Sequence, residues 1–375
     1  MIARPPVGGI LARVMPDIDG ATRDRARAAL DTLEASGAPW YLRLLTGIGA
    51  WAGGGFMLSF IMAMVAAILG ADNFEGLAII LGIGLMAAAV MLRRGANGTS
   101  VGAQFLRQLA LVACFSGQMM FIGGVGSTTK STEAASVATL IASAILIAVY
   151  PDRVVRFCST IMAASSLLWL MRDIPYCADV MALGLTGAVL FLGRGMSREA
   201  QDEQAEIIEP VIYGLAIALF ALLIVSTAVM MFGVSDFDLE EVRAVLIGKA
   251  TAFGFVLALL WLTASIFGEH GEPPTSPEAL LSFVAIIAIG AITQSTPAIT
   301  ATMLMLVLGF DRRARALIAL STLFFLTFGA SYYYGLHLTL LQKSGILAAS
   351  GVVCLMASAF VRYRYRGHGV QEGNA

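Results

Sequence analysis

The side chains that could do chemistry in this sequence are few, and most of them interrupt or flank long apolar stretches. They carry carboxylate, ammonium, amide or hydroxyl groups, which are costly inside a bilayer unless they are paired or hydrated. The candidates for a polar site are Lys249, Lys343, Asp179, Gln118, Gln294 and Thr339. If they converge near the outer membrane boundary, they form a polar cavity open to the outside. The alternative is that the lysines snorkel to the headgroups and the other groups serve packing and pairing.

A second group of distinctive residues lies between the last two apolar stretches, in the segment 329–344. Four of them are candidates for contact with a partner: Tyr332, Tyr333, Tyr334 and His337. Tyrosine rings are also favoured at the level of the lipid headgroups, where they anchor a span without any further role. Both interpretations predict that the tyrosines lie at the outer membrane boundary.

Catalytic signatures are absent from the sequence. It has no nucleophile elbow, zinc-protease motif, phosphate-binding loop or dinucleotide fingerprint. The three histidines and four cysteines lack the spacing of a metal site or of a disulfide framework. We therefore predict that the protein is not an enzyme and uses no cofactor, no metal and no nucleic acid. An enzyme with its active site inside the helices would need a nucleophile and a base that the sequence does not identify.

The elements that must position these residues are apolar helices. Of the 375 residues, 58% are hydrophobic and only 13% are charged, which is outside the usual balance of a soluble domain. Apolar runs recur from about residue 45 onward, and one helical span of a bilayer needs roughly 20 residues. The sequence therefore predicts an all-α, polytopic helical membrane protein with about 12 transmembrane helices.

The boundaries of the predicted spans follow the apolar runs. The spans are 45–69, 76–92, 109–125, 135–150, 154–171, 175–192, 211–232, 245–267, 279–292, 297–310, 316–328 and 341–361. The ninth and tenth are short, and a polar break that ends in Pro297 separates them. This pattern indicates either two thin spans or a re-entrant pair. Discontinuous helices often form transporter sites.

The basic residues set the predicted orientation. Most of the 24 Lys and Arg residues fall near the N-terminus, in alternate connectors and in the C-terminal tail, and cytoplasmic loops are the ones that accumulate such residues. We therefore predict that both termini are cytoplasmic. The predicted parts are a polar N-terminal segment with one amphipathic helix, residues 1–44, a transmembrane domain, residues 45–361, and a basic tail, residues 362–375.

The sequence also carries a family resemblance. The matching residues are Tyr332-Tyr333-Tyr334, Leu336, Thr339-Leu340-Leu341, Lys343-Ser344 and Gly351, with Pro39-Trp40-Tyr41, Arg43 and Trp51 near the start. In these residues the chain resembles a bacterial inner-membrane family, domain of unknown function 4401, over about residues 35–362. The resemblance implies a multi-pass protein of the bacterial inner (cytoplasmic) membrane. It also implies a protein partner, because such proteins tend to be encoded beside a small membrane-anchored protein with a GDYxxLxY motif, which this chain lacks.

Two functional hypotheses follow for a protein placed in the lipid bilayer. The first is a permease or transporter that binds an unknown solute or lipid at the outer-facing polar site. The second is a membrane scaffold that binds and stabilises a small membrane-anchored partner protein through the tyrosine-rich segment. The spacing of the polar residues does not discriminate between them, because buried Lys and Gln side chains serve packing, pairing and transport alike.

Overall fold

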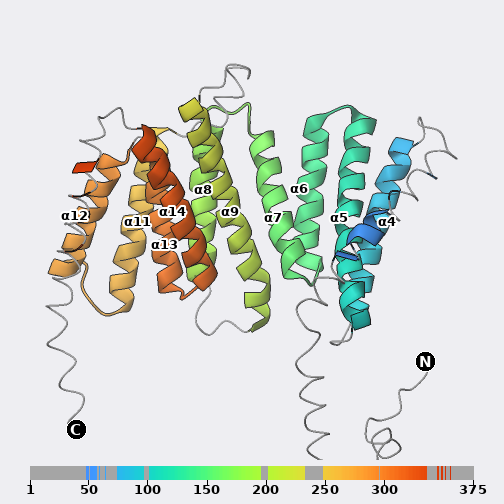
Figure 1. The fold of residues 1–375 in the computed structure, drawn as a ribbon, viewed down its shortest axis with the longest axis horizontal. Helices are drawn as coiled ribbons and strands as arrows, with labels where there is room; N and C mark the ends of the chain where they lie inside the picture. The colour runs from blue at the N-terminus through green and yellow to red at the C-terminus, as the bar shows by residue number, and fades with distance from the viewer. Residues whose placement is uncertain are drawn as a thin grey trace, which may run out of the picture. The chain divides into compact units, whose positions relative to one another are not determined.

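In the computed structural model of the chain (Figure 1), every element of regular structure among the described residues is a helix. The structure describes residues 48–49, 51–56, 59, 64, 74–96, 101–195, 202–232, 248–294, 296–335, 344–345, 348, 351 and 355. The predicted N-terminal helix, the basic tail and most of the predicted span 341–361 lie outside the described residues. So do Lys343, Thr339 and His337.

The middle ten predicted spans each coincide with one helix (Figure 1). These are α4 (Phe74–Gly95), α5 (Val101–Thr129), α6 (Thr132–Val149), α7 (Arg153–Leu170), α8 (Cys177–Gly195), α9 (Asp202–Phe232), α11 (Lys249–Glu269), α12 (Pro277–Ile292), α13 (Pro297–Asp311) and α14 (Arg315–Gly335). Among the described residues, eight helices are long and apolar enough to cross a membrane, whereas α12 and α13 are shorter. An all-α architecture with several candidate membrane spans is therefore confirmed. The total of about 12 spans and the cytoplasmic position of both termini stay predictions.

Three helices run well beyond the predicted spans. α5 covers Val101–Thr129 instead of residues 109–125. α9 begins at Asp202 instead of residue 211, because Pro210 lies inside the helix and does not end the preceding connector. α14 ends at Gly335 instead of residue 328, so the three tyrosines are helical. The predicted boundaries lie where apolar side chains give way to polar ones. The helices end where their backbone hydrogen bonds end, which is beyond that point.

The chain divides into two compact units. Unit 1 contains Met1–Cys177 and Arg194–Ala218, and unit 2 contains Ala178–Gly193 and Leu219–Ala375. Both α8 and α9 therefore contribute residues to each unit.

α4 and α5 of unit 1 approach each other closely because glycines lie where they touch. A Cβ on Gly82 would lie 2.6 Å from the backbone nitrogen of Phe121 and 2.7 Å from the carbonyl oxygen of Gly117. A Cβ on Gly124, two turns after Gly117, would lie 3.0 Å from the carbonyl oxygen of Glu75. Small residues let helix backbones meet inside a bilayer, where helix association depends on close packing. Backbone contact therefore holds this pair together.

The interior of unit 1 lies among α4, α5, α6 and the start of α7. One cluster of buried side chains joins these helices: Ala89, Leu111, Ala113, Cys114, Leu146, Tyr150 and Val155. The side chains of Ser131 and Asp152 begin α6 and α7 by accepting hydrogen bonds from the backbone N–H groups of Ala134 and Val154, as N-cap residues do. The caps fix where α6 and α7 start, and the cluster fixes how they pack.

In unit 1 a side chain of α7 forms a hydrogen bond to α9 next to a proline. Pro210 has no N–H group, so the carbonyl oxygen of Glu206, four residues earlier, lacks its usual helical donor. The buried side chain of Arg156 on α7 donates to that oxygen at 3.2 Å and to the carbonyl oxygen of Ile147 at 3.1 Å. Gly214, one turn after the proline, lets α9 approach the backbone of α7 closely. The guanidinium group therefore replaces the donor that the proline removes.

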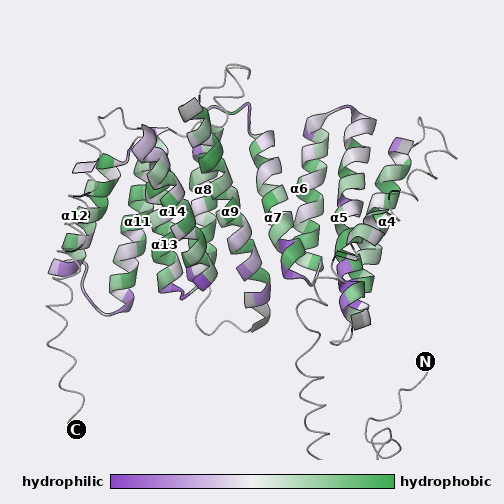
Figure 2. Cartoon of the chain, viewed as in Figure 1, coloured by the Kyte–Doolittle hydropathy of each residue, from purple (hydrophilic) through white to green (hydrophobic). Residues whose placement is uncertain are grey.

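Hydrophilic residues gather near the ends of the helices (Figure 2), and one end of unit 1 holds two groups of ion pairs. Arg93, at the end of α4, lies 3.2 Å from Asp152, at the start of α7. Arg153 lies 3.9 Å from Glu206 and 3.4 Å from Glu209, in the first turns of α9. The end of α4 and the starts of α7 and α9 therefore meet at one face of the unit.

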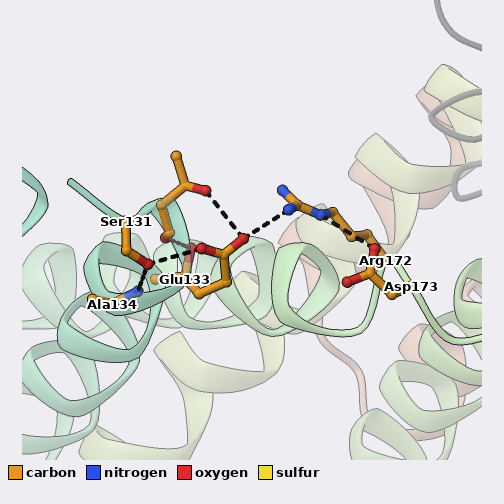
Figure 3. Close-up of polar contacts among 7 residues, drawn as sticks. Ser131, Glu133, Ala134, Arg172 and Asp173 are labelled. Atoms are coloured by element: carbon orange, nitrogen blue, oxygen red, sulfur yellow. Dashed lines mark hydrogen bonds and ion pairs between the residues drawn. The ribbon is translucent and has the colours of Figure 1, made fainter. Parts of the chain in front are cut away.

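The opposite end of α6 and α7 carries a second network (Figure 3). The side chain of Arg172 donates to Glu133 at 2.7 Å, pairs with Asp173 at 3.5 Å and lies over the ring of Trp169, 4.6 Å from its centroid. The hydroxyl group of Ser131 also donates to Glu133, at 2.8 Å. These exposed pairs contribute little to stability, but they mark where the apolar part of the two helices ends.

The two networks agree with the predicted alternation of the connectors. The pair Arg93–Asp152 joins two connectors that the sequence places on the cytoplasmic side, and the pair Glu133–Arg172 joins two that it places outside. Consecutive spans that reverse direction produce this pairing. Which end faces the cytoplasm stays a prediction from the distribution of Lys and Arg.

α13 lies in the interior of unit 2. Its buried residues are Ala298, Ile299, Thr300, Ala301, Thr302, Leu304, Met305, Leu308 and Gly309. It packs against α11 and α14, and a Cβ on Gly193 of α8 would lie 3.3 Å from the side chain of Leu308. Phe220 of α9 stacks on Phe324 of α14 with centroids 4.4 Å apart. A short helix that follows a polar break is therefore surrounded by longer ones.

Candidate functional site

One predicted site residue, Asp179, is a buried carboxylate with two hydrogen-bond donors. It lies in the first turn of α8, in unit 2, and is 7% exposed. Its Oδ1 accepts hydrogen bonds from the backbone N–H group of Gly248, at 2.8 Å, and from the hydroxyl group of Thr251. A buried carboxylate needs such donors, because burying an unpaired charge is strongly unfavourable.

Both donors come from the start of α11. Gly248 is the N-cap of that helix and has no side chain that could accept from the first turn, a role that Ser, Thr, Asp or Asn usually fills. Asp179 supplies the acceptor from the neighbouring helix instead. The positive end of the α11 dipole also favours a negative group at this position. The carboxylate therefore caps α11 from outside and ties α8 to it.

The second oxygen of the carboxylate, Oδ2, differs from Oδ1 in its hydrogen bonding. Oδ2 of Asp179 accepts no hydrogen bond from any residue that the structure describes. A Cβ added to Gly248 would lie 3.4 Å from it, so the glycine leaves space beside this oxygen. Oδ2 is therefore the atom at which a cation, a proton or a donor group of a solute can bind.

Two other candidates of unit 2 lie at the surface. Lys249 is exposed at the first position of α11, and Gln294 is exposed after the end of α12. Thr293, in the polar break, is buried. Its hydroxyl group donates to the carbonyl oxygen of Ile289 at 2.8 Å and lies 3.3 Å from the hydroxyl group of Thr300. Thr293 therefore links the end of α12 to α13.

Gln118, the remaining candidate among the described residues, lies in unit 1. It is fully buried between α5 and α6. Its Nε2 donates to Oγ of Ser143 at 3.1 Å, whereas its Oε1 has no hydrogen-bond partner among the described residues. It differs from Asp179 in charge and in the unit to which it belongs.

Reasoning from the sequence missed both partners of Asp179. A glycine at the start of an apolar run, followed by a threonine three residues later, is a signal for a helix that begins without a capping side chain. That signal locates Gly248 and Thr251 at a helix start. It does not reveal that the acceptor comes from a residue 69 positions earlier, because such a pair depends on how α8 and α11 pack.

The three tyrosines form the last turn of α14 in unit 2. The hydroxyl group of Tyr332 donates to the carbonyl oxygen of Ile292, at the end of α12, at 3.4 Å. The rings of Tyr333 and Tyr334 meet edge to face with centroids 5.6 Å apart, and Tyr334 is 74% exposed. Tyr332 therefore fastens α14 to α12, whereas Tyr334 is accessible to lipid or to another protein.

The other groups that could do chemistry form no recognisable site among the described residues. No three His, Cys, Asp or Glu side chains gather into a possible metal site within the described residues. Tyr150, in the connector after α6, is buried, and its hydroxyl group has no hydrogen-bond partner among the described residues.

A family model described as domain of unknown function (DUF4401) matches residues 39–364. The matched region contains every helix from α4 to α14 and, with them, Asp179, Gln118 and the tyrosines. No curated protein and no solved structure matches the chain.

Proposed function

This chain belongs to the DUF4401 family, and we propose that it is a permease-like membrane protein in which Asp179 binds a cation. The cation is either the transported solute or the ion or proton that drives transport. One observation carries the proposal: a buried carboxylate has one oxygen held by two donors while the other accepts no hydrogen bond from the described residues. Ionisable residues among membrane-spanning helices usually mark substrate or ion pathways.

The arrangement favours a ligand with a positive charge. Gly248 and Thr251 hold Oδ1, so the carboxylate presents Oδ2 without having to reorient. An anion would meet a negative charge there, and a ligand without a donor group would leave Oδ2 unpaired. A cation or a proton satisfies both the charge and the oxygen.

The first test compares solute uptake by the wild type and by Asp179→Asn. Asparagine keeps the shape and the acceptor oxygen that caps α11 but removes the charge. Membrane vesicles containing each protein are incubated with a cell extract, washed, and their contents are identified by mass spectrometry. We expect one or more solutes, cationic where the solute itself binds Asp179, to accumulate in wild-type vesicles and to fall by about tenfold or more with Asp179→Asn, which corresponds to about 1.4 kcal/mol of lost interaction.

Asp173→Asn is the matched control, because the side chain of Asp173 is 88% exposed, and we expect it to transport as the wild type does. The amount of folded protein is measured in parallel by size-exclusion chromatography. Three results would contradict the proposal: wild-type vesicles that accumulate no more than empty ones, undiminished uptake by Asp179→Asn, or a loss of uptake that matches the loss of folded protein.

A partner-binding scaffold is the second candidate function, and the exposure of Tyr334 favours it. The occupant would be a small membrane-anchored protein that contacts the end of α14. Tyr333→Ala combined with Tyr334→Ala and His337→Ala is then expected to reduce the amount of protein that co-purifies in mild detergent by about fivefold or more, a loss of roughly 1 kcal/mol. Tyr332→Phe, which keeps the ring, serves as the control. Equal co-purification with both variants would argue against a scaffold.

A further inference from the structure

Unit 1 contains a layer of buried polar groups that has no part in the Asp179 site. It consists of Gln118 on α5, Ser143 on α6 and Ser159 on α7, each with no exposed surface (0%). We infer that this polar layer is a second binding site, which takes a small uncharged molecule that both donates and accepts hydrogen bonds, of the size of water. The inference stands independently of transport through Asp179.

Each of the three residues lies one helical turn from a member of the buried cluster of unit 1. The hydrogen bond from Gln118 to Ser143 sets the level of α5 against α6. The buried cluster of unit 1 joins α5, α6 and α7, and residues one helical turn apart share a face of a helix. The polar layer extends that shared face by one turn on each helix: Gln118 follows Cys114, Ser143 precedes Leu146, and Ser159 follows Val155.

Two atoms of the polar layer have unused hydrogen-bonding capacity. Oε1 of Gln118 and Oγ of Ser159 have no hydrogen-bond partner among the described residues. Exchanging the oxygen and nitrogen of the Gln118 amide does not remove the deficit, because the Ser143 hydroxyl group can pair with either end and the other end stays unpaired. Unpaired polar groups are especially costly among membrane-spanning helices, where bulk water does not reach them. A molecule bound between the two atoms would satisfy both.

The side chains also define the class of ligand. None of the three residues is ionisable, and an ion bound among them would have no opposite charge. Arg156, one turn before Ser159, is already engaged with the carbonyl oxygens of Ile147 and Glu206. The amide oxygen requires a donor, and the serine hydroxyl groups can donate or accept. A buried water typically makes about three hydrogen bonds, which these three side chains can supply.

Ser159→Ala tests the inference, because it deletes one hydroxyl group and changes little else. Removing a hydroxyl group that has no partner raises stability, whereas removing one that holds a bound molecule lowers it. We expect the melting temperature of the purified protein in detergent to fall by about 2–4 °C. Ser166→Ala on the same helix is the matched control. Its hydroxyl group already donates to the carbonyl oxygen of Met162 at 2.8 Å, so we expect a smaller change.

A double-mutant cycle separates a shared ligand from two independent effects. Gln118→Leu removes the other end of the site. The double variant Ser159→Ala/Gln118→Leu should lose less stability than the sum of the losses in the two single variants, because each change releases the same molecule. An electron cryomicroscopy map should show density within hydrogen-bonding distance of Gln118 Oε1 and Ser159 Oγ. A higher melting temperature for Ser159→Ala, additive losses, or a map without such density would overturn the inference.

Discussion

Gly82→Leu is expected to lower the yield of folded protein by at least about tenfold. The new Cβ would lie 2.6 Å from the backbone nitrogen of Phe121 and 2.7 Å from the carbonyl oxygen of Gly117. Backbone atoms cannot rotate away as a side chain can, so α4 and α5 must separate. Overpacking alone costs about 1–3 kcal/mol or more, and separation also removes the close contact that holds two helices together in a bilayer.

The measurement is the monodisperse fraction in size-exclusion chromatography of the fluorescently tagged protein. Gly84→Leu is the control, because it lies on the same helix and a Cβ there would meet no atom within 4 Å. We expect Gly84→Leu to behave as the wild type does. Similar yields for Gly82→Leu and Gly84→Leu would show that α4 and α5 do not touch at Gly82.

Arg156→Leu should destabilise the protein by about 2–3 kcal/mol. The change leaves the carbonyl oxygens of Glu206 and Ile147 without the donor that each has in the structure, and losing a charged donor to a buried acceptor costs about this much. Arg153→Leu is the control, since the side chain of Arg153 is 61% exposed and its ion pairs are solvated. The free energy of unfolding, measured for each variant under the same detergent conditions, gives the comparison.

Pro210→Ala provides a second, independent variant for the same contact. Alanine restores the N–H group that the helix lacks at this position, so the carbonyl oxygen of Glu206 regains a donor within α9. Pro210→Ala should therefore stabilise the Arg156→Leu protein more than it stabilises the wild type, whose carbonyl oxygen already has Arg156. Equal effects in the two backgrounds would mean that the guanidinium group and the proline are unrelated.

The fold was predictable from the sequence to the extent that hydrophobicity determines it. Ten apolar runs correspond to ten helices, because a bilayer leaves the backbone of a span little alternative to intrahelical hydrogen bonding. The boundaries failed where a helix continues through residues that usually end one. Pro210 stays inside α9 because Arg156 takes over its missing donor, and a contact between residues so distant in the sequence cannot be read from local pattern.

The candidate site was predictable only in part, for the same reason. Asp179 attracts attention because a carboxylate is rare in an apolar run, but its partners follow from the packing of α8 against α11. Lys249 is equally rare in such a run and lies exposed at a helix start. Ser159 gave no signal, since serine is common in membrane helices and only its burial without a partner distinguishes it.

The division of the chain into two units has a consequence for how the protein can be taken apart or recombined. Unit 1 is interrupted by Ala178–Gly193, and the chain returns to it in Arg194–Ala218 before continuing into unit 2. A fragment that ends between α8 and α9 therefore carries a helix of unit 2 and lacks part of α9 that belongs to unit 1. Neither unit can be produced by truncation alone, and exchanging halves between relatives at that connector would exchange parts of both units.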